Sequence, residues 1–184
     1  MRLFIAAVPC GELKNEIIKA RDAIRAQGVR GNYTRTEHIH LTLAFIGEFP
    51  DPGKVLEVMR GIPFEGACVS LSGLGRFGDL WWCALSCPGT LYGYAERLRK
   101  ELSRAGIPFD GRPFKPHVTI LRRADREFVP PDVKQISGTI EKISLMRSDR
   151  DGGVLRYTAL GSVRPQVGSA LQRKDGPGHA GDEV

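Results

Sequence analysis

A pattern of histidine, apolar residue, threonine and apolar residue occurs twice in this chain of 184 residues. It reads HLTL from His40 and HVTI from His117, and each copy lies in an apolar run that predicts a short buried strand. Because side chains alternate across a strand, His40 and Thr42 would share one face, and so would His117 and Thr119. Two imidazoles and two hydroxyls could then converge on one cleft, a set that suits proton transfer around a phosphate.

The repeat extends upstream of both copies. The first is preceded by an apolar run at 3–8 that predicts a strand, then Pro9 and an amphipathic stretch with helical spacing. The second is preceded by a strand-like run at 81–87, then Pro88 and another amphipathic stretch. The motif histidine follows 31 positions after Pro9 and 29 after Pro88. Two unrelated tripeptides would not carry matched strands and helices, so we predict two equivalent lobes that face each other across the paired motifs.

The remaining elements make the predicted class α+β. A short helix over 51–60 is expected to begin near Pro52. Strands are predicted over 136–146 and 154–160, and the sequence DRDGG between them is typical of a hairpin turn. A further strand over 69–74 would lead into a connection loosened by glycines 73, 75 and 78.

Composition divides the chain in two. We assign residues 1–164 to one bilobal domain, and residues 165–184, which are polar and rich in glycine, to a disordered C-terminal tail that contains His179. No apolar run approaches the ~20 residues that span a bilayer, and the opening segment is too short for a secretory signal. We therefore expect a cytoplasmic protein, and a monomer because the two lobes already face each other.

The formal charge of +6 favours a polyanionic partner such as nucleic acid, although many proteins are mildly basic without a specific reason. Basic residues gather around the two motifs, which favours the nucleic-acid interpretation: Arg30, Arg35, Arg112, Lys115, Arg122 and Arg123. No glycine-rich nucleotide fingerprint, zinc spacing or disulfide framework is present, so neither a cofactor nor a metal is expected.

The two motifs, the opening MRLFIA, and the segments HLTLAFIGE and RPFKPHVTILR closely resemble the two-histidine (2H) phosphoesterase superfamily. Within it, residues 1–163 look like the RNA 2′,3′-cyclic phosphodiesterases, also called 2′-5′ RNA ligases. The resemblance implies two lobes, each an antiparallel sheet with helices, around a metal-free cleft. It also implies that His40 is the proton donor and His117 the proton acceptor, roles that the near-identical motifs do not themselves distinguish.

The chemistry follows from the residue types. A neutral imidazole would take a proton from water, an imidazolium would protonate the departing ribose oxygen, and Thr42 and Thr119 would donate to the phosphate oxygens. The family carries an arginine five residues after the second histidine, which is Arg122 here. Strict alternation would instead turn Arg123 toward the cleft. A β-bulge would reconcile the two, and on that basis Arg122 is preferred as a phosphate ligand.

Several alternatives stay open on the sequence. Trp81, Trp82, Phe114 and Tyr157 could stack an RNA base or belong to the core. The function could be hydrolysis of RNA 2′,3′-cyclic phosphate ends to 2′-phosphates, 2′-5′ ligation of tRNA halves, or RNA binding without catalysis. Intact histidines and threonines argue against the last, and hydrolysis is favoured in water. The substrate could be a tRNA half, a short oligonucleotide, a cyclic mononucleotide or an ADP-ribose cyclic phosphate.

Overall fold

A computed structural model describes residues 1–87 and 89–165, and within them the chain forms two antiparallel sheets with three α-helices. Pro88 and nearly all of the predicted tail, including His179, lie outside the described residues. No helix in the described part is both long and apolar enough to cross a membrane. The helices are α1 (Gly11–Ala26), α2 (Pro52–Arg60) and α3 (Thr90–Arg104), and a 3-10 turn, η1, covers Thr36–His38.

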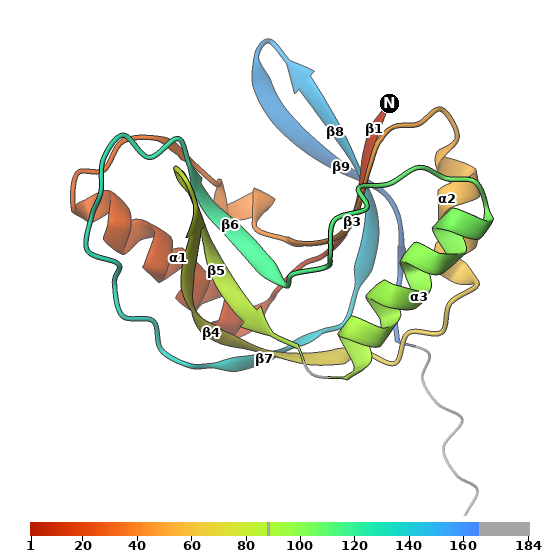
Figure 1. Cartoon of the computed structure of the whole chain (residues 1–184), viewed down its shortest axis with the longest axis horizontal. Coiled ribbons are helices and arrows are strands. Elements are labelled where there is room, and N and C mark those ends of the chain that lie inside the picture. Colours follow the sequence, from red (N-terminus) through yellow and green to blue (C-terminus); the bar gives the residue numbers. More distant parts are fainter. Residues whose placement is uncertain (88, 166–184) are drawn as a thin grey trace, which may run out of the picture.

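The two sheets share a four-strand order that begins with the motif strand, and the second sheet has one extra strand at its edge; this confirms the predicted α+β class with two pseudo-symmetric lobes (Figure 1). The first runs β3–β1–β8–β9, with β1 (Arg2–Ala7), β3 (Leu41–Glu48), β8 (Ile143–Asp151) and β9 (Val154–Val163). The second runs β2–β6–β5–β4–β7, with β2 (Asn32–Tyr33), β4 (Ala67–Phe77), β5 (Leu80–Ser86), β6 (His117–Arg122) and β7 (Ser137–Ile140). The motif strands β3 and β6 each pair with the strand that opens their half of the chain, β1 or β5.

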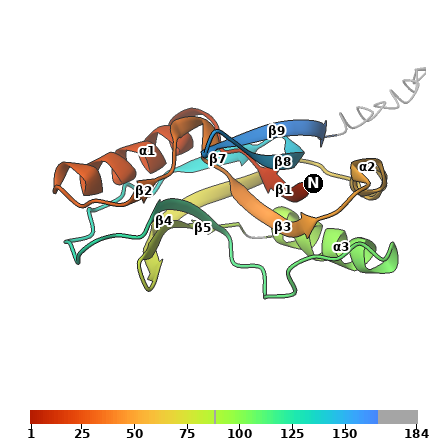
Figure 2. The same ribbon diagram turned by 90° about the horizontal axis from the view of Figure 1, so that it is seen from above.

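The helices do not stay with their own half of the chain. α1 follows β1 of the first sheet but packs against β4, β6 and β7 of the second. α3 follows β5 of the second sheet and lies on the side of the first, against β3 and α2 as well as β4 (Figures 1 and 2). The apolar periodicity of a helix tells which of its faces is buried, but not which sheet covers that face. The packing of α1 and α3 on the sheet of the other lobe could therefore not be predicted from the sequence.

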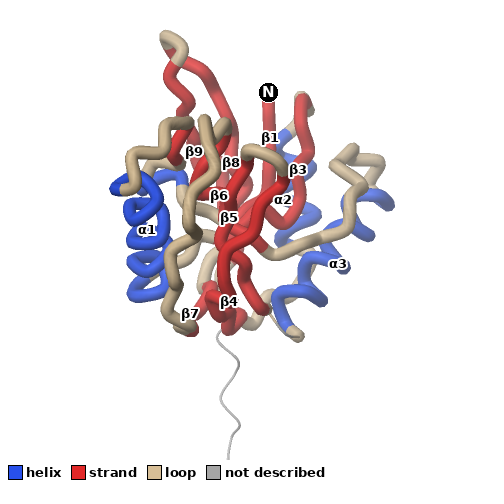
Figure 3. Tube along the Cα trace, turned by 60° about the vertical axis from the view of Figure 1, so that its left-hand side comes forward, coloured by secondary structure: helices blue, strands red, loops and turns tan. Residues whose placement is uncertain are grey.

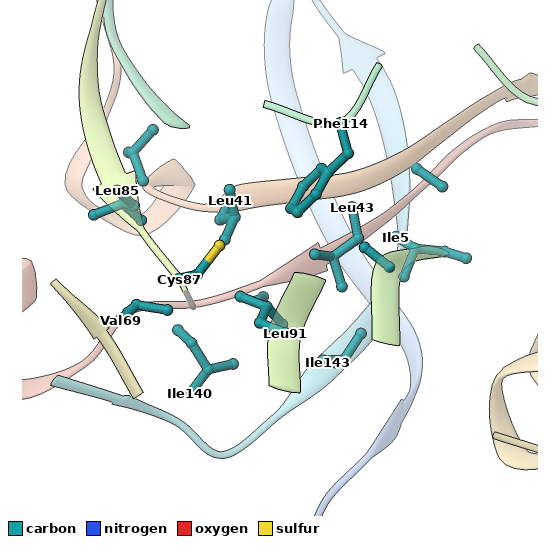
Figure 4. Packing of buried hydrophobic residues seen from close by; sticks show 14 of the residues in the cluster. Ile5, Leu41, Leu43, Val69, Leu85, Cys87, Leu91, Phe114, Ile140 and Ile143 are labelled. Atoms are coloured by element: carbon teal, nitrogen blue, oxygen red, sulfur yellow. The ribbon is translucent and has the colours of Figure 1, made fainter. Parts of the chain in front are cut away.

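One hydrophobic core joins the two lobes. In Figure 4, Ile5 and Leu43 from the first sheet lie near Leu91 of α3, and Val69 and Ile140 of the second sheet adjoin them. These side chains are no more than 1% exposed. Close packing in this shared core therefore fixes the position of the two motif strands relative to each other.

Two predicted elements were wrong. The run 136–146 is not one strand, because β7 ends at Ile140 and belongs to the second sheet whereas β8 belongs to the first. Gly73 and Gly75, expected in a loose connection, lie inside β4, whereas Gly78 lies in the turn between β4 and β5 (Figure 3). Gly73 follows a register shift, and Gly75 faces Trp82, whose ring would lie 2.2 Å from a Cβ there. Hydrophobic periodicity could not predict the register shift before Gly73 or the close approach of Trp82 to Gly75.

Other predicted features were confirmed. α2 begins at Pro52, and the Asp51 carboxylate caps it by accepting a 3.0 Å hydrogen bond from Lys54 N. Gly152 and Gly153 form the turn between β8 and β9, both with positive φ as a two-residue hairpin of this kind requires.

The docking of α1 on the second sheet can be tested at Gly138 of β7. An added Cβ would lie 2.9 Å from Cβ of Leu13 in α1. Gly138→Ala should therefore lower the free energy of unfolding by roughly 1–3 kcal/mol, the usual effect of overpacking, as measured by urea denaturation. Gly93→Ala in α3 is the matched control, because nothing lies within 4 Å of its added Cβ and alanine favours a helix. Equal effects of the two substitutions would contradict the docking.

Candidate active site

Both motif strands bulge at the same place. The register of β3 against β1 slips at Leu43, and the register of β6 against β5 slips at Ile120, so each bulge directly follows a motif threonine. The bulged residue and its successor are both buried in each strand, where unbroken alternation would turn one of them outward. The two bulges therefore shift the cleft-facing positions by one residue in both lobes.

The bulge in β6 explains which arginine faces the cleft. Arg122 lines the cleft with His117 and Thr119, whereas Arg123 lies outside its lining and has a φ of 57° as the strand ends. Strict alternation fails because Ile120 is the extra residue. The matching position after the first bulge is held by Phe45, which also lines the cleft. The two lobes thus present different side chains at equivalent places.

The structure brings all five candidate residues together. The cleft has a volume of about 510 Å³ and lies between the motif strands of the two sheets. One wall is formed by the segment between α3 and β6. The lining consists of His40, Thr42, Leu43, Ala44, Phe45, Phe77, Leu80, Arg99, Asp110, Arg112, Pro113, Phe114, Lys115, His117, Thr119 and Arg122.

The two histidines are held in the same way. Nδ1 of His40 donates to the His38 carbonyl at 2.6 Å, and Nδ1 of His117 donates to the Lys115 carbonyl at 2.6 Å. Because a carbonyl can only accept, each Nδ1 carries the hydrogen. Nε2 of each ring is then left to accept a proton when the ring is neutral or donate one when it is charged. The site has the chemical form of an acid and base pair.

Separate contacts hold the segment before each histidine. The buried guanidinium of Arg21 in α1 donates to the Thr34 carbonyl at 2.8 Å and to Oγ1 of Thr36 at 3.2 Å, which fixes the chain that leads to His40. Tyr157 of β9 then packs edge-on against the His40 ring, with centroids 5.5 Å apart. Helix α1 and strand β9 together therefore position the first histidine.

The approach to His117 is anchored across the lobes. Asp110 N donates to the Phe45 carbonyl of β3 at 2.8 Å, and Nη2 of Arg99 in α3 donates to the carbonyls of Asp110 and Arg112 at 3.0 and 2.5 Å. The Arg112 guanidinium and main-chain N–H hold the pKa of Asp110 at about 2. This carboxylate is thus a fixed negative charge beside Arg112 on the wall of the cleft.

Burial lowers the pKa of His40 below its ordinary value. The His38 carbonyl opposes this shift by favouring the charged ring, and the positive charges of Arg122, His38 and His117 reinforce it. Neutral His40 is therefore favoured in the free protein. A bound phosphate anion would act in the opposite direction.

The aromatic candidates take different places. Trp81 is buried against Phe128, with ring centroids 4.3 Å apart, and Phe114 is only 9% exposed. The ring centroids of Trp82 and His117 lie 5.7 Å apart, and Trp82 is not among the residues that line the cleft. Sequence reasoning missed Phe77, because only the pairing of β4 with β5 brings it to the cleft.

No group of three or more histidine, cysteine, aspartate or glutamate side chains in the described residues could hold a metal ion. All four cysteines fall within the described part, and all are free thiols. The polar side chains that line the cleft carry imidazole, hydroxyl, guanidinium, amine and carboxylate groups.

Comparison with known proteins gives consistent matches. The model of the family described as LigT like Phosphoesterase matches residues 8–80 and again 85–155, once in each half. An RNA 2′,3′-cyclic phosphodiesterase of Escherichia coli is 32% identical over 165 residues, covering 86% of this chain and 93% of its own. One of Thermus thermophilus is 30% identical over 200 residues, covering 97% of each chain.

Solved structures with a similar fold carry names from the same family. E. coli LigT in its apo form superposes with a TM-score of 0.76 at 29% identity, covering 90% of this chain and 98% of its own. The same protein has been solved with 3′-AMP, with a TM-score of 0.74 at 28% identity over 89% and 97% of the two chains.

The electrostatic link between Arg122 and His40 can be measured by NMR titration of the imidazole resonances. Arg122→Ala removes a positive charge that disfavours the imidazolium, so the pKa of His40 should rise. Arg123→Ala makes the same charge change outside the cleft lining and should leave it nearly unchanged. Equal shifts in both variants would show that overall charge, and not the bulge that turns Arg122 inward, sets the effect.

Proposed function

The chain belongs to the family of LigT-like phosphoesterases, and from this membership and its cleft we propose that it is an RNA 2′,3′-cyclic phosphodiesterase that produces a 2′-phosphate. The observation that carries the proposal is the mirrored pair of His and Thr side chains that line one cleft, with both Nδ1 atoms tied to carbonyls. Two relatives that match most of this chain are named for this activity.

The reaction needs two proton transfers. We propose that Nε2 of His117 takes a proton from a water molecule whose oxygen attacks phosphorus. The bond from phosphorus to the ribose 3′ oxygen breaks, and Nε2 of His40 gives that oxygen its proton. The products are a 2′-phosphate and a 3′-hydroxyl. Exchange of protons with solvent then returns both rings to their starting states.

The neighbouring groups would stabilise charge on the phosphate. Thr42 and Thr119 are proposed to donate to its non-bridging oxygens, and Arg122 to hold one of them with its guanidinium. Bound phosphate would also raise the pKa of His40, against the lowering caused by burial. The anion beside the ring favours the imidazolium that a proton donor requires.

We further propose that the enzyme uses no metal or cofactor, since a strained cyclic phosphate requires only proton transfer and charge stabilisation. Its setting is proposed to be the cytoplasm, which suits four free thiols. A monomer suffices because the described residues of one chain supply both histidines. Residues 1–164 would form the catalytic unit.

The primary test uses an oligoribonucleotide that ends in a 2′,3′-cyclic phosphate, assayed in EDTA with the position of the product phosphate identified. Wild-type protein should give a 2′-phosphate. His40→Ala and His117→Ala should each lower kcat by about 10²-fold or more, the usual size of an acid-base contribution, with the fold intact by circular dichroism. A dependence on added metal, or full turnover by either variant, would refute the mechanism.

The assignment of donor and acceptor can be tested with sulfur in place of the 3′ bridging oxygen. A thiolate, from a thiol of pKa about 8.5, leaves without prior protonation. His40→Ala should therefore recover much of its lost rate on this substrate, while His117→Ala should remain slow. Rescue of His117→Ala instead would exchange the two roles.

A further inference from the structure

Arg2 carries an exposed guanidinium beside the cleft. It opens β1 on the same face as Phe4, whose ring centroid lies 5.0 Å from that of His40. The guanidinium carbon of Arg2 lies 5.1 Å from the centroid of the Phe45 ring, and Phe45 lines the cleft. Attraction to this ring holds the positive charge in one place at the rim of the site.

The side-chain hydrogen-bond donors of Arg2 are free. Glu48 is its partner in the pairing of β1 with β3, but the Glu48 carboxylate binds the N-terminal amine of Met1 at 3.1 Å. Among the described residues, none accepts a hydrogen bond from the Arg2 guanidinium or forms an ion pair with it. This guanidinium can therefore still hold an anion with its fork of N–H groups.

The arginines on the wall between α3 and β6 are already engaged. Arg99 donates to the carbonyls of Asp110 and Arg112, and the Arg112 guanidinium binds the Asp110 carboxylate. A phosphate group at Arg112 would have to compete with that carboxylate. Arg2 has no such competitor among the described side chains, so it is the more available cation.

Tyr157 connects Arg2 with the reacting groups. Its ring centroid lies 5.5 Å from that of His40 and 4.9 Å from that of Phe4. Burial raises the pKa of Tyr157, and the positive charges of Arg122 and Arg2 both oppose that rise. Both guanidinium groups therefore lie near the Tyr157 hydroxyl, which places Arg2 on the flank of the cleft that contains His40.

Positive charge continues beyond Arg2 on the same face of the sheet. Arg2 pairs with Ser148 of β8, and the exposed Arg150 lies two residues further along that face. Figure 1 shows the hairpin of β8 and β9 projecting from the first sheet beside the N-terminal end of β1. A polyanion that leaves the cleft on this flank would meet Arg2 first and Arg150 further out.

The proposed reaction determines which part of an RNA chain lies on this flank. Because His40 gives its proton to the departing 3′ oxygen, C3′ of the ribose lies on the side of His40. C3′ is bonded to C4′, which carries C5′ and the phosphodiester to the preceding nucleotide, whereas the base is attached beyond C2′, at C1′. The preceding phosphodiester therefore emerges on the His40 flank, toward Tyr157 and Arg2.

We propose that Arg2 binds the phosphodiester group that joins the terminal nucleotide to the preceding one. This inference rests on the proposed function and adds that the substrate is the end of an oligoribonucleotide, because a cyclic mononucleotide lacks that phosphodiester. The guanidinium over Phe45 donates to the non-bridging oxygens. Since the contact is made to phosphate, it carries no preference for the sequence of bases.

The test uses two diribonucleotides that both end in a 2′,3′-cyclic phosphate. One has the natural internal phosphodiester, and in the other an uncharged methylphosphonate replaces it. Arg2→Gln should raise KM for the first by roughly 3- to 10-fold, the size of a charge-assisted contact that solvent partly screens. The KM for the second should barely change. Arg2→Lys keeps the charge and should lose less on the first substrate.

Arg147→Gln is the matched control, because it removes one positive charge from the same hairpin. Arg147 pairs with the fully buried Leu3, so it lies on the opposite face of β8 from Ser148, the partner of Arg2. This variant should behave as wild type on both substrates. A loss equal to that of Arg2→Gln would mean that overall charge, and not a contact at Arg2, attracts the RNA.

Two other results would overturn the subsite. Equal losses of Arg2→Gln on both substrates would mean that Arg2 only supports Phe45, and no loss on either would mean that the preceding phosphodiester lies elsewhere. If wild-type protein turns over neither substrate, the proposed function fails. Calorimetric titration with the two diribonucleotides ending in a 3′-phosphate then decides the contact alone, which requires that Arg2→Gln weaken binding of only the one with a charged linkage.

Discussion

The alternation of side chains across a strand is the constraint on which the rest of this structure depends. One face of β3 and of β6 must fill the shared core while the other supplies the cleft. A regular strand would present residues two, four and six positions after each histidine. By inserting one residue after each threonine, the two bulges replace that series with positions two and five. Arg122 thereby enters the cleft while the apolar residues of β6 stay buried.

The two motif histidines have equivalent backbone positions but different side-chain surroundings. Both histidines use the same hydrogen bond to a carbonyl two residues earlier, yet their surroundings differ. His40 lies among Phe4 and Tyr157, where burial lowers its pKa, whereas His117 adjoins the exposed Phe77. A duplicated frame can therefore hold two rings in one geometry while the two lobes surround them with different side chains.

Much of this architecture could be predicted from the sequence. The repeated motif, the strand and helix before each copy, and the choice of Arg122 all rest on local periodicity or on the family resemblance. The exchange of α1 and α3 between the lobes could not be predicted, because periodicity does not identify a helix's partner. Phe77 was missed for a similar reason. It reaches the cleft only through the pairing of β4 with β5, a contact between strands that its own neighbours in sequence do not reveal.

The crossed packing of the helices also bears on how the chain folds. β1 lies between β3 and the late strand β8, and α1 rests on the later strands β4, β6 and β7 of the second sheet. A nascent N-terminal half would therefore expose the apolar face of α1 until β4, β6 and β7 had been synthesised. Most contacts between residues join distant parts of the sequence, a topology that slows folding. Folding and assembly of the site should therefore be one cooperative event, and neither half is expected to persist as a separate folded unit.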